Sequence, residues 1–104
     1  MASKVFGIKR KFVEFKYDFL DGETANFKVL EPTGKMIRES VSAASDIEKS
    51  LDLGVEQFKE CLRTEQTEDI DKLITEQNEE GNIYDFIKEI MNLLEKEKTK
   101  KTKN

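Results

Sequence analysis

The sequence predicts a single α+β domain in which an N-terminal β-hairpin packs on a mostly helical part of about four helices. Two segments near the N-terminus, about 11–19 and 23–30, alternate apolar and polar residues around an Asp-Gly pair, which is typical of two strands joined by a tight turn. From about 35 to 94 the apolar residues recur at helical spacing instead. The only proline separates the two parts, in the loop EPTGK. We therefore expect one domain over 1–94, with the hairpin at about 11–30.

The hairpin can be closed in two registers, and only one brings its apolar residues together. A two-residue turn at Asp21-Gly22 places Phe15 opposite Lys28, so that the apolar rows lie on opposite faces of the sheet. A three-residue loop ending at Gly22 places Phe15 opposite Phe27 and brings both rows to one face. That loop needs a left-handed residue at Gly22, as in a type I turn followed by a G1 bulge. The sequence predicts this longer loop, and it predicts that helices cover the apolar face, because two strands are marginal in water.

The first helices are predicted from capping and stop signals. The periodic segment of about 35–51 is interrupted by the small, polar run SVSAAS, after which Asp46 can cap a second segment. Gly54 follows in LDLG and predicts a helix end. A short helix of about 55–63 is expected next.

The later helices have clearer signals. Thr67 is a good N-cap residue and is followed by acidic residues, which suit the first turn of a helix. Gly81 predicts the C-terminal end of this helix, and Asn82 can cap the last one. After Leu94 the sequence EKEKTKKTKN has no apolar side chain, so 95–104 is predicted to be a disordered lysine-rich tail.

Charge and composition favour a cytoplasmic protein whose partners are proteins. Residues 18–94 carry nineteen of the 22 acidic residues and eight of the 18 basic ones, and such an acidic body repels nucleic acid. The sequence has no apolar run long enough for a transmembrane helix and no signal peptide, so we expect no membrane association. Its one cysteine, Cys61, cannot form an internal disulfide, which fits a reducing compartment.

Several classes of chemistry are excluded by what the chain lacks. With no histidine and one cysteine, it cannot form the usual zinc sites, a Cys-His nucleophile or a Ser-His-Asp triad. The five glycines are scattered singly, so the sequence has no phosphate-binding loop. The acidic run that starts at Asp69 lacks the glycine and the alternating oxygen ligands of a calcium loop. We therefore expect no enzymatic activity, no metal and no cofactor.

The candidate binding residues lie on the last helix, which is the most apolar segment of the chain. Such a stripe can occupy a groove of a partner, or form a groove for a partner helix. The competing interpretation is that the stripe is core and packs on the hairpin. The candidate partner-binding residues are Ile83, Phe86, Ile87, Ile90, Leu93 and Leu94.

Taken together, the aromatic hairpin FVEFKYDFLDGETANFKV, the proline loop LEPTG, the acidic amphipathic helices and the polar lysine-rich end form a pattern. Over about 12–95 this pattern resembles the tail assembly chaperones of long-tailed bacteriophages. The resemblance implies a non-enzymatic role in the cytoplasm of a bacterial host. Such chaperones bind the long helical tape measure protein and keep it soluble until tail-tube subunits polymerise around it. The resemblance rests on order, size and charge, so it assigns no role to any single residue.

Two other functions are compatible with the sequence. The first is a small adaptor or regulatory protein that docks a folded partner through the last helix. The second is a nucleic-acid accessory protein that uses Lys9-Arg10-Lys11 and the lysine-rich end. An exposed hairpin edge also invites pairing with another strand, which would make the protein a homo-oligomer.

Overall fold

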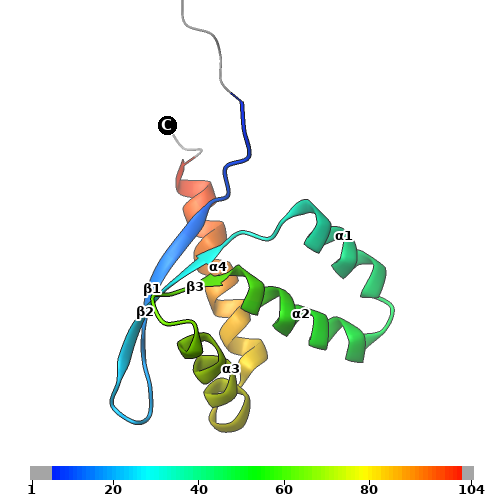
Figure 1. Ribbon diagram of the computed structural model, residues 1–104. Coiled ribbons are helices and arrows are strands. Elements are labelled where there is room, and N and C mark those ends of the chain that lie inside the picture. The colour runs from blue at the N-terminus through cyan, green and yellow to red at the C-terminus, as the bar shows by residue number, and fades with distance from the viewer. Residues whose placement is uncertain (1–5, 102–104) are drawn as a thin grey trace, which may run out of the picture.

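The computed structural model describes residues 6–101, and the side chains of residues 6–96 (Figure 1). A three-stranded antiparallel sheet packs on helices, and two of the helices project to one side as a helical hairpin. The predicted α+β class with an N-terminal hairpin and four helices is confirmed. In chain order the elements are β1 (Phe12–Asp18), β2 (Thr24–Leu30), α1 (Gly34–Ala43), α2 (Ile47–Cys61), β3 (Leu62–Arg63), α3 (Glu68–Glu80) and α4 (Ile83–Lys101).

The hairpin has the predicted register. Phe15 lies opposite Phe27, and their rings are stacked with centroids 5.4 Å apart. The N–H of Phe19 donates to the carbonyl oxygen of Glu23 at 2.8 Å, so three residues form the loop. The last of them, Gly22, has a φ of 92°, in the left-handed region that the G1 bulge requires.

Replacing Gly22 with alanine is expected to lower the free energy of unfolding by about 1–2 kcal/mol, because an L side chain is strained at this φ. An added Cβ would meet no atom within 4 Å, so the loss comes from backbone conformation and not from a clash. Gly54→Ala is the matched control: it also places a Cβ in open space, but inside α2, where alanine is expected to add up to about 1 kcal/mol. Urea denaturation followed by circular dichroism measures both changes. Stabilisation by Gly22→Ala would contradict the left-handed loop.

Of the two predictions for the helices after the loop EPTGK, the cap at Asp46 is confirmed and the helix end at Gly54 is wrong. Asp46 caps α2, as predicted: its Oδ1 accepts the backbone N–H three residues on at 3.1 Å. The predicted stop at Gly54 is wrong, because α2 continues through it to Cys61 and joins the two helices predicted on either side. A glycine inside a helix costs about 1 kcal/mol, and the burial of Phe58 and Cys61 on the same helix outweighs that cost.

The third strand was not predicted by the sequence pattern, which extends a helix over these residues. In β3, Leu62 lies opposite Val29, and both side chains are buried. The hydroxyl of Thr64 then donates to the carbonyl oxygen of Asn26 at 2.8 Å. Consequently β3 pairs with part of the outer edge of β2, and β1 remains an edge strand of the sheet.

The boundary between α3 and α4, and the start of α3, lie where the sequence predicted them. The capping interactions at Thr67 and Gly81 differ from those predicted. Thr67 precedes α3, but its side chain makes no capping hydrogen bond. Gly81 ends α3 with a φ of −122°, so it does not adopt the left-handed conformation usual for such a glycine. Asn82 caps α4 as predicted: its Oδ1 accepts the N–H groups of Tyr84 and Asp85 at 3.1 and 3.2 Å.

The last helix is longer than the sequence predicted. It continues past Leu94 to Lys101, whereas the predicted disordered tail begins at residue 95. Glutamate and lysine are good helix formers and no glycine or proline interrupts the segment, so the absence of apolar residues does not end the helix. Residues 102–104 of the predicted tail lie outside the described residues. None of the described helices is long and apolar enough to cross a bilayer.

The core lies between the apolar face of the hairpin and helices α2, α3 and α4. Phe86 of α4 is half-buried against this core and makes edge-to-face contacts with Phe15, Tyr17 and Phe58, at centroid distances of 6.0, 5.7 and 6.1 Å. Over the part of the chain with described side chains, every buried residue is apolar. The main buried cluster consists of Phe19, Phe27, Val29, Met36, Phe58, Cys61, Leu62, Leu73 and Ile90.

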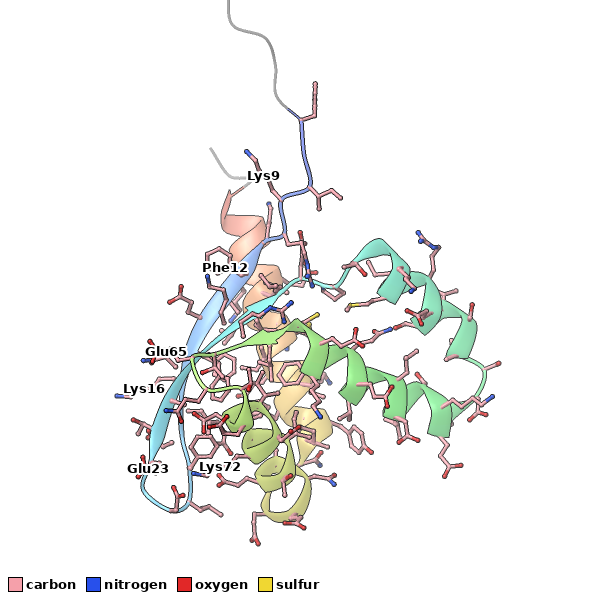
Figure 2. The ribbon with its side chains drawn as sticks, in the orientation of Figure 1. Lys9, Phe12, Lys16, Glu23, Glu65 and Lys72 are labelled. Atoms are coloured by element: carbon pink, nitrogen blue, oxygen red, sulfur yellow. The ribbon has the colours of Figure 1, made fainter. Side chains whose placement is uncertain are left out.

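The loop end of the hairpin is fixed to α3 by polar contacts. The hydroxyl of Tyr17 donates to Glu76 Oε1 at 2.8 Å, and the N–H of Leu20 donates to Glu76 Oε2 at 3.1 Å. Burial raises the pKa of Tyr17, so the phenol stays protonated as this hydrogen bond requires. Lys72 Nζ lies 2.6 Å from Asp21 Oδ2 beside the loop, near Glu23 in Figure 2. The hairpin is therefore held in place from both its apolar face and its loop.

Candidate protein-binding surface

The candidate binding stripe on α4 is mostly core. Ile83, Ile90 and Leu94 are buried, and Phe86 and Ile87 are half-buried against the core cluster. Leu93 is 41% exposed. The hairpin and helices α2 and α3 of the same chain thus cover most of the stripe, and only Leu93 is left available to a partner.

Exposed apolar side chains gather instead on the part that projects from the molecule. We call α1, residues 44–46 and α2 the helical arm, which extends away from the sheet in Figure 1. Its exposed apolar residues are Ile37, Val41, Ile47 and Leu51, with exposed fractions of 55, 70, 76 and 40%. We refer to these four residues as the arm face.

Two hydrogen bonds and one contact between sulfur atoms link the two helices of the arm. Gln57 Nε2 donates to the carbonyl oxygen of Met36 at 2.9 Å, and the hydroxyl of Ser40 donates to Gln57 Oε1 at 3.0 Å. The sulfur atoms of Met36 and Cys61 are 3.8 Å apart. Met36 reaches Cys61 at the end of α2, whereas Ser40, one turn later on α1, reaches Gln57, one turn earlier on α2. The two helices therefore run antiparallel. These positions mark the sides of α1 and α2 that face each other.

From these contacts it follows that the arm face lies on one side of the arm. Ile37 and Val41 each come one residue after a contact position of α1, and Phe58 comes one residue after a contact position of α2. One step along a helix turns by about 100°, and in an antiparallel pair this turn leads to the same side of both helices. Leu51 and Ile47 share that side of α2 with Phe58, since they precede it by two and three helical turns.

This side of the arm continues the apolar surface of the core. Phe58 is buried and its ring packs edge-to-face on Phe86 of α4. Farther out along the arm the same side carries Leu51, Ile47 and Val41. Among the described residues, these three side chains are exposed, whereas Phe58 is buried. The arm face is therefore a continuation of the core stripe beyond the elements that bury it.

The opposite side of the arm is polar. A shallow hollow of about 470 Å³ lies there between α1 and α2, and Lys35, Glu39, Ser42 and Lys49 are among its lining residues. The arm is thus two-sided, with a charged side and an apolar side. An amphipathic pair of helices that projects into solvent with its apolar side uncovered is typical of a docking surface.

Acidic residues flank the arm face on α2. Glu48 and Asp52 each follow an arm-face residue by one position and lie one turn apart. Both are exposed, and within the described chain neither takes part in an ion pair. A partner segment with basic residues beside an apolar stripe would complement this arrangement.

Other hollows and reactive groups offer little for chemistry. An open hollow of about 790 Å³ between α2 and α3 is lined mostly by charged residues, and Lys59 and Asp71 form an exposed ion pair across it at 2.5 Å. In the described chain, no group of acidic and cysteine side chains is arranged to hold a metal ion. Burial raises the pKa of Cys61, despite the Arg10 guanidinium 3.5 Å from its sulfur, so the thiol stays protonated and acts as a small core residue.

Comparison with known proteins gives no further guidance. No family model, no curated protein and no solved structure matches the chain at a significant level. The surface of the molecule and the sequence pattern are therefore the indications of its function.

Proposed function

We propose that the protein is a non-enzymatic binding protein that holds an amphipathic helix of a partner protein on the arm face. The single observation that carries the proposal is the group of four exposed apolar side chains on one side of a projecting helical arm. An apolar helix face in solvent is stabilised when a second helix covers it, and partner helices are recognised through residues at such i, i+4 spacing. Ile37 with Val41 and Ile47 with Leu51 have this spacing on the two helices of the arm.

The acidic side chains beside the arm face on α2 outnumber the one basic side chain, Arg38, that follows an arm-face residue on α1, and they favour one kind of partner helix. Glu48 and Asp52 would lie beside the bound helix, so basic residues flanking its apolar stripe are stabilised and acidic ones are disfavoured. The acidic body of the protein would also keep an apolar partner in solution. We therefore propose a basic, amphipathic, helical client.

The resemblance to phage tail assembly chaperones suggests the identity of the client. A tape measure protein is long and helical, and its apolar stripes must stay covered before tail-tube subunits assemble around it. We propose that the arm face provides this cover, in the cytoplasm of a bacterial host. The alternative, an adaptor that docks through the last helix, has less support, because Leu93 is the one strongly exposed residue of that stripe.

Two helical peptides with the same leucine stripe test the binding surface, one flanked by lysine and one by glutamate. We expect the lysine peptide to bind at least about tenfold more tightly in fluorescence anisotropy. Val41→Asp and Ile47→Asp should each weaken this binding about tenfold or more, because each introduces a charge into the contact. Leu20→Asp is the matched control, since Leu20 is as exposed as these residues, at 73%, but lies on the hairpin loop. Equal binding by all variants would refute the arm face as the site.

The phage-specific part of the proposal has its own test. Co-expression with a long helical protein encoded next to this chain should keep that protein in the soluble fraction, and both should elute together in size-exclusion chromatography. The Val41→Asp variant should leave the helical protein in the pellet, whereas Leu20→Asp should not. If peptides bind but no tape-measure-like protein is recovered, the surface stands and the phage assignment fails.

A further inference from the structure

The strand β1 has an open edge. The strand order is β1-β2-β3, so within residues 6–101 β1 pairs on one side only. It lies at the rim of the molecule in Figure 1, and Figure 2 shows Phe12 and Lys16 along it on the side away from α1 and α2. An open strand of seven residues is a template for pairing with another strand.

Hydrogen bonds show which backbone groups of β1 face outward. The N–H of Phe19 donates to Glu23, and the N–H of Glu31 donates to the carbonyl oxygen of Lys11. In an antiparallel pair such bonded positions recur every second residue, so the odd-numbered residues of β1 bond to β2. The outward N–H and C=O groups therefore belong to Phe12, Glu14, Lys16 and Asp18. No hydrogen bond within the described chain reaches these groups.

These four positions restrict how a second copy of β1 could pair antiparallel with the first. Every bonded pair must join two even-numbered residues, so the register can shift only in steps that keep even opposite even. Full overlap of the two strands places Phe12 opposite Asp18 of the second copy and centres the pair on Phe15. In this register Glu14 lies opposite Lys16 of the second copy, and the same pair occurs again on the other side of the centre.

The neighbouring registers are electrostatically unfavourable. A shift in one direction places Glu14 opposite Glu14 of the second copy, and a shift in the other places Lys16 opposite Lys16. Like charges opposite each other destabilise a strand pair, whereas opposite charges stabilise it. Glu14 and Lys16 are exposed and form no ion pair with any described residue. Backbone pairing, strand overlap and side-chain charge therefore select the same register.

We propose that two copies of the chain associate through β1, antiparallel and centred on Phe15, to form a continuous six-stranded sheet. The odd-numbered side chains of both copies then lie on the same face, so the helices of both copies stay on one side of the sheet. Two strand edges bury less surface than a standard protein interface, so the dimer is expected to be weak and concentration-dependent. This surface is separate from the arm face and stands whether or not the arm binds a client.

Sedimentation equilibrium and hydrogen exchange of the full chain test the pairing. From about 10 μM to about 1 mM, the range in which small interfaces associate, we expect the average mass to rise from monomer to dimer. Over the same range the amide protons of Phe12, Glu14, Lys16 and Asp18 should become protected from exchange. A monomer throughout this range, or a dimer whose β1 amides exchange as fast as in the dilute protein, overturns the proposal.

A charge exchange tests the register itself. Glu14→Lys and Lys16→Glu should each weaken dimerisation about tenfold, because each places like charges opposite each other twice. The variant with both substitutions restores opposite pairs and should recover most of the association. Glu89→Lys, an exposed site on α4, makes the same charge change as Glu14→Lys away from the edge and should have little effect. Circular dichroism confirms that each variant is folded, and failure of the double variant to recover association overturns this register.

Discussion

Replacing Phe27 with alanine is expected to lower the free energy of unfolding by about 3–5 kcal/mol. Its side chain is 2% exposed and lies between the rings of Phe15, Tyr17 and Phe19, with centroids 5.4, 6.5 and 6.4 Å away. Alanine would remove both the transfer free energy of the ring and its contacts with these neighbours, and would leave a cavity that the sheet cannot close. Domains of this size are stable by only about 5–15 kcal/mol, so the variant is expected to unfold at much lower urea concentration.

Phe12→Ala provides the matched control on the same hairpin. Phe12 is 40% exposed on the solvent face, where Lys28 Nζ lies 4.3 Å above its ring centroid. Loss of this contact is expected to cost less than about 1 kcal/mol. Urea titrations of both variants, followed by far-UV circular dichroism, give the comparison. Equal losses would contradict the assignment of Phe27 to the core and Phe12 to the surface.

The hairpin could be predicted from the sequence because strand pairing has a strict parity. A shift of one residue moves Phe15 from Phe27 to Lys28 and separates the apolar rows, so the pattern allows one answer. The left-handed conformation of Gly22 follows from the same argument. In this part of the chain, local sequence and long-range packing impose the same requirement.

The helical boundaries could not be predicted as well, because tertiary contacts override weak local signals. Gly54 resembles a helix end, yet the packing of Phe58 one turn later keeps α2 continuous. The strand β3 is two residues long, too short for a period to be recognised, and it forms because Leu62 is buried opposite Val29. Both features depend on residues far apart in the sequence.

The candidate site shows why a helical stripe does not identify its own partner. Ile37, Val41, Ile47 and Leu51 have helical spacing in the sequence, but so do the buried residues of α4. Which stripe is covered depends on how far each helix extends beyond the sheet, and the sequence does not encode this locally. One signal was available: the apolar stripes of α1, α2 and α4 together exceed what one hairpin of two seven-residue strands can cover.

The role of the last helix can be decided by a pair of aspartate substitutions. Ile90 is 5% exposed within the core cluster, so Ile90→Asp would bury a carboxylate without a partner. We expect a loss of about 5 kcal/mol or more, which removes the whole stability of a domain at the lower end of the range of about 5–15 kcal/mol and unfolds the protein. The expected observations are loss of the dispersed methyl signals in the NMR spectrum and of the cooperative thermal transition in circular dichroism.

Leu93→Asp on the same helix is the control, because its side chain is 41% exposed and an aspartate there can reach water. Its cost is expected to stay within about 1 kcal/mol, mainly from the lower helix propensity of aspartate. If the Ile90→Asp variant instead folded normally and lost only its binding to a partner protein, the α4 stripe would be a binding surface that becomes exposed when the core opens. Unfolding by Ile90→Asp together with a folded Leu93→Asp would assign the stripe to the core, and client binding would then depend on the exposed residues of the arm.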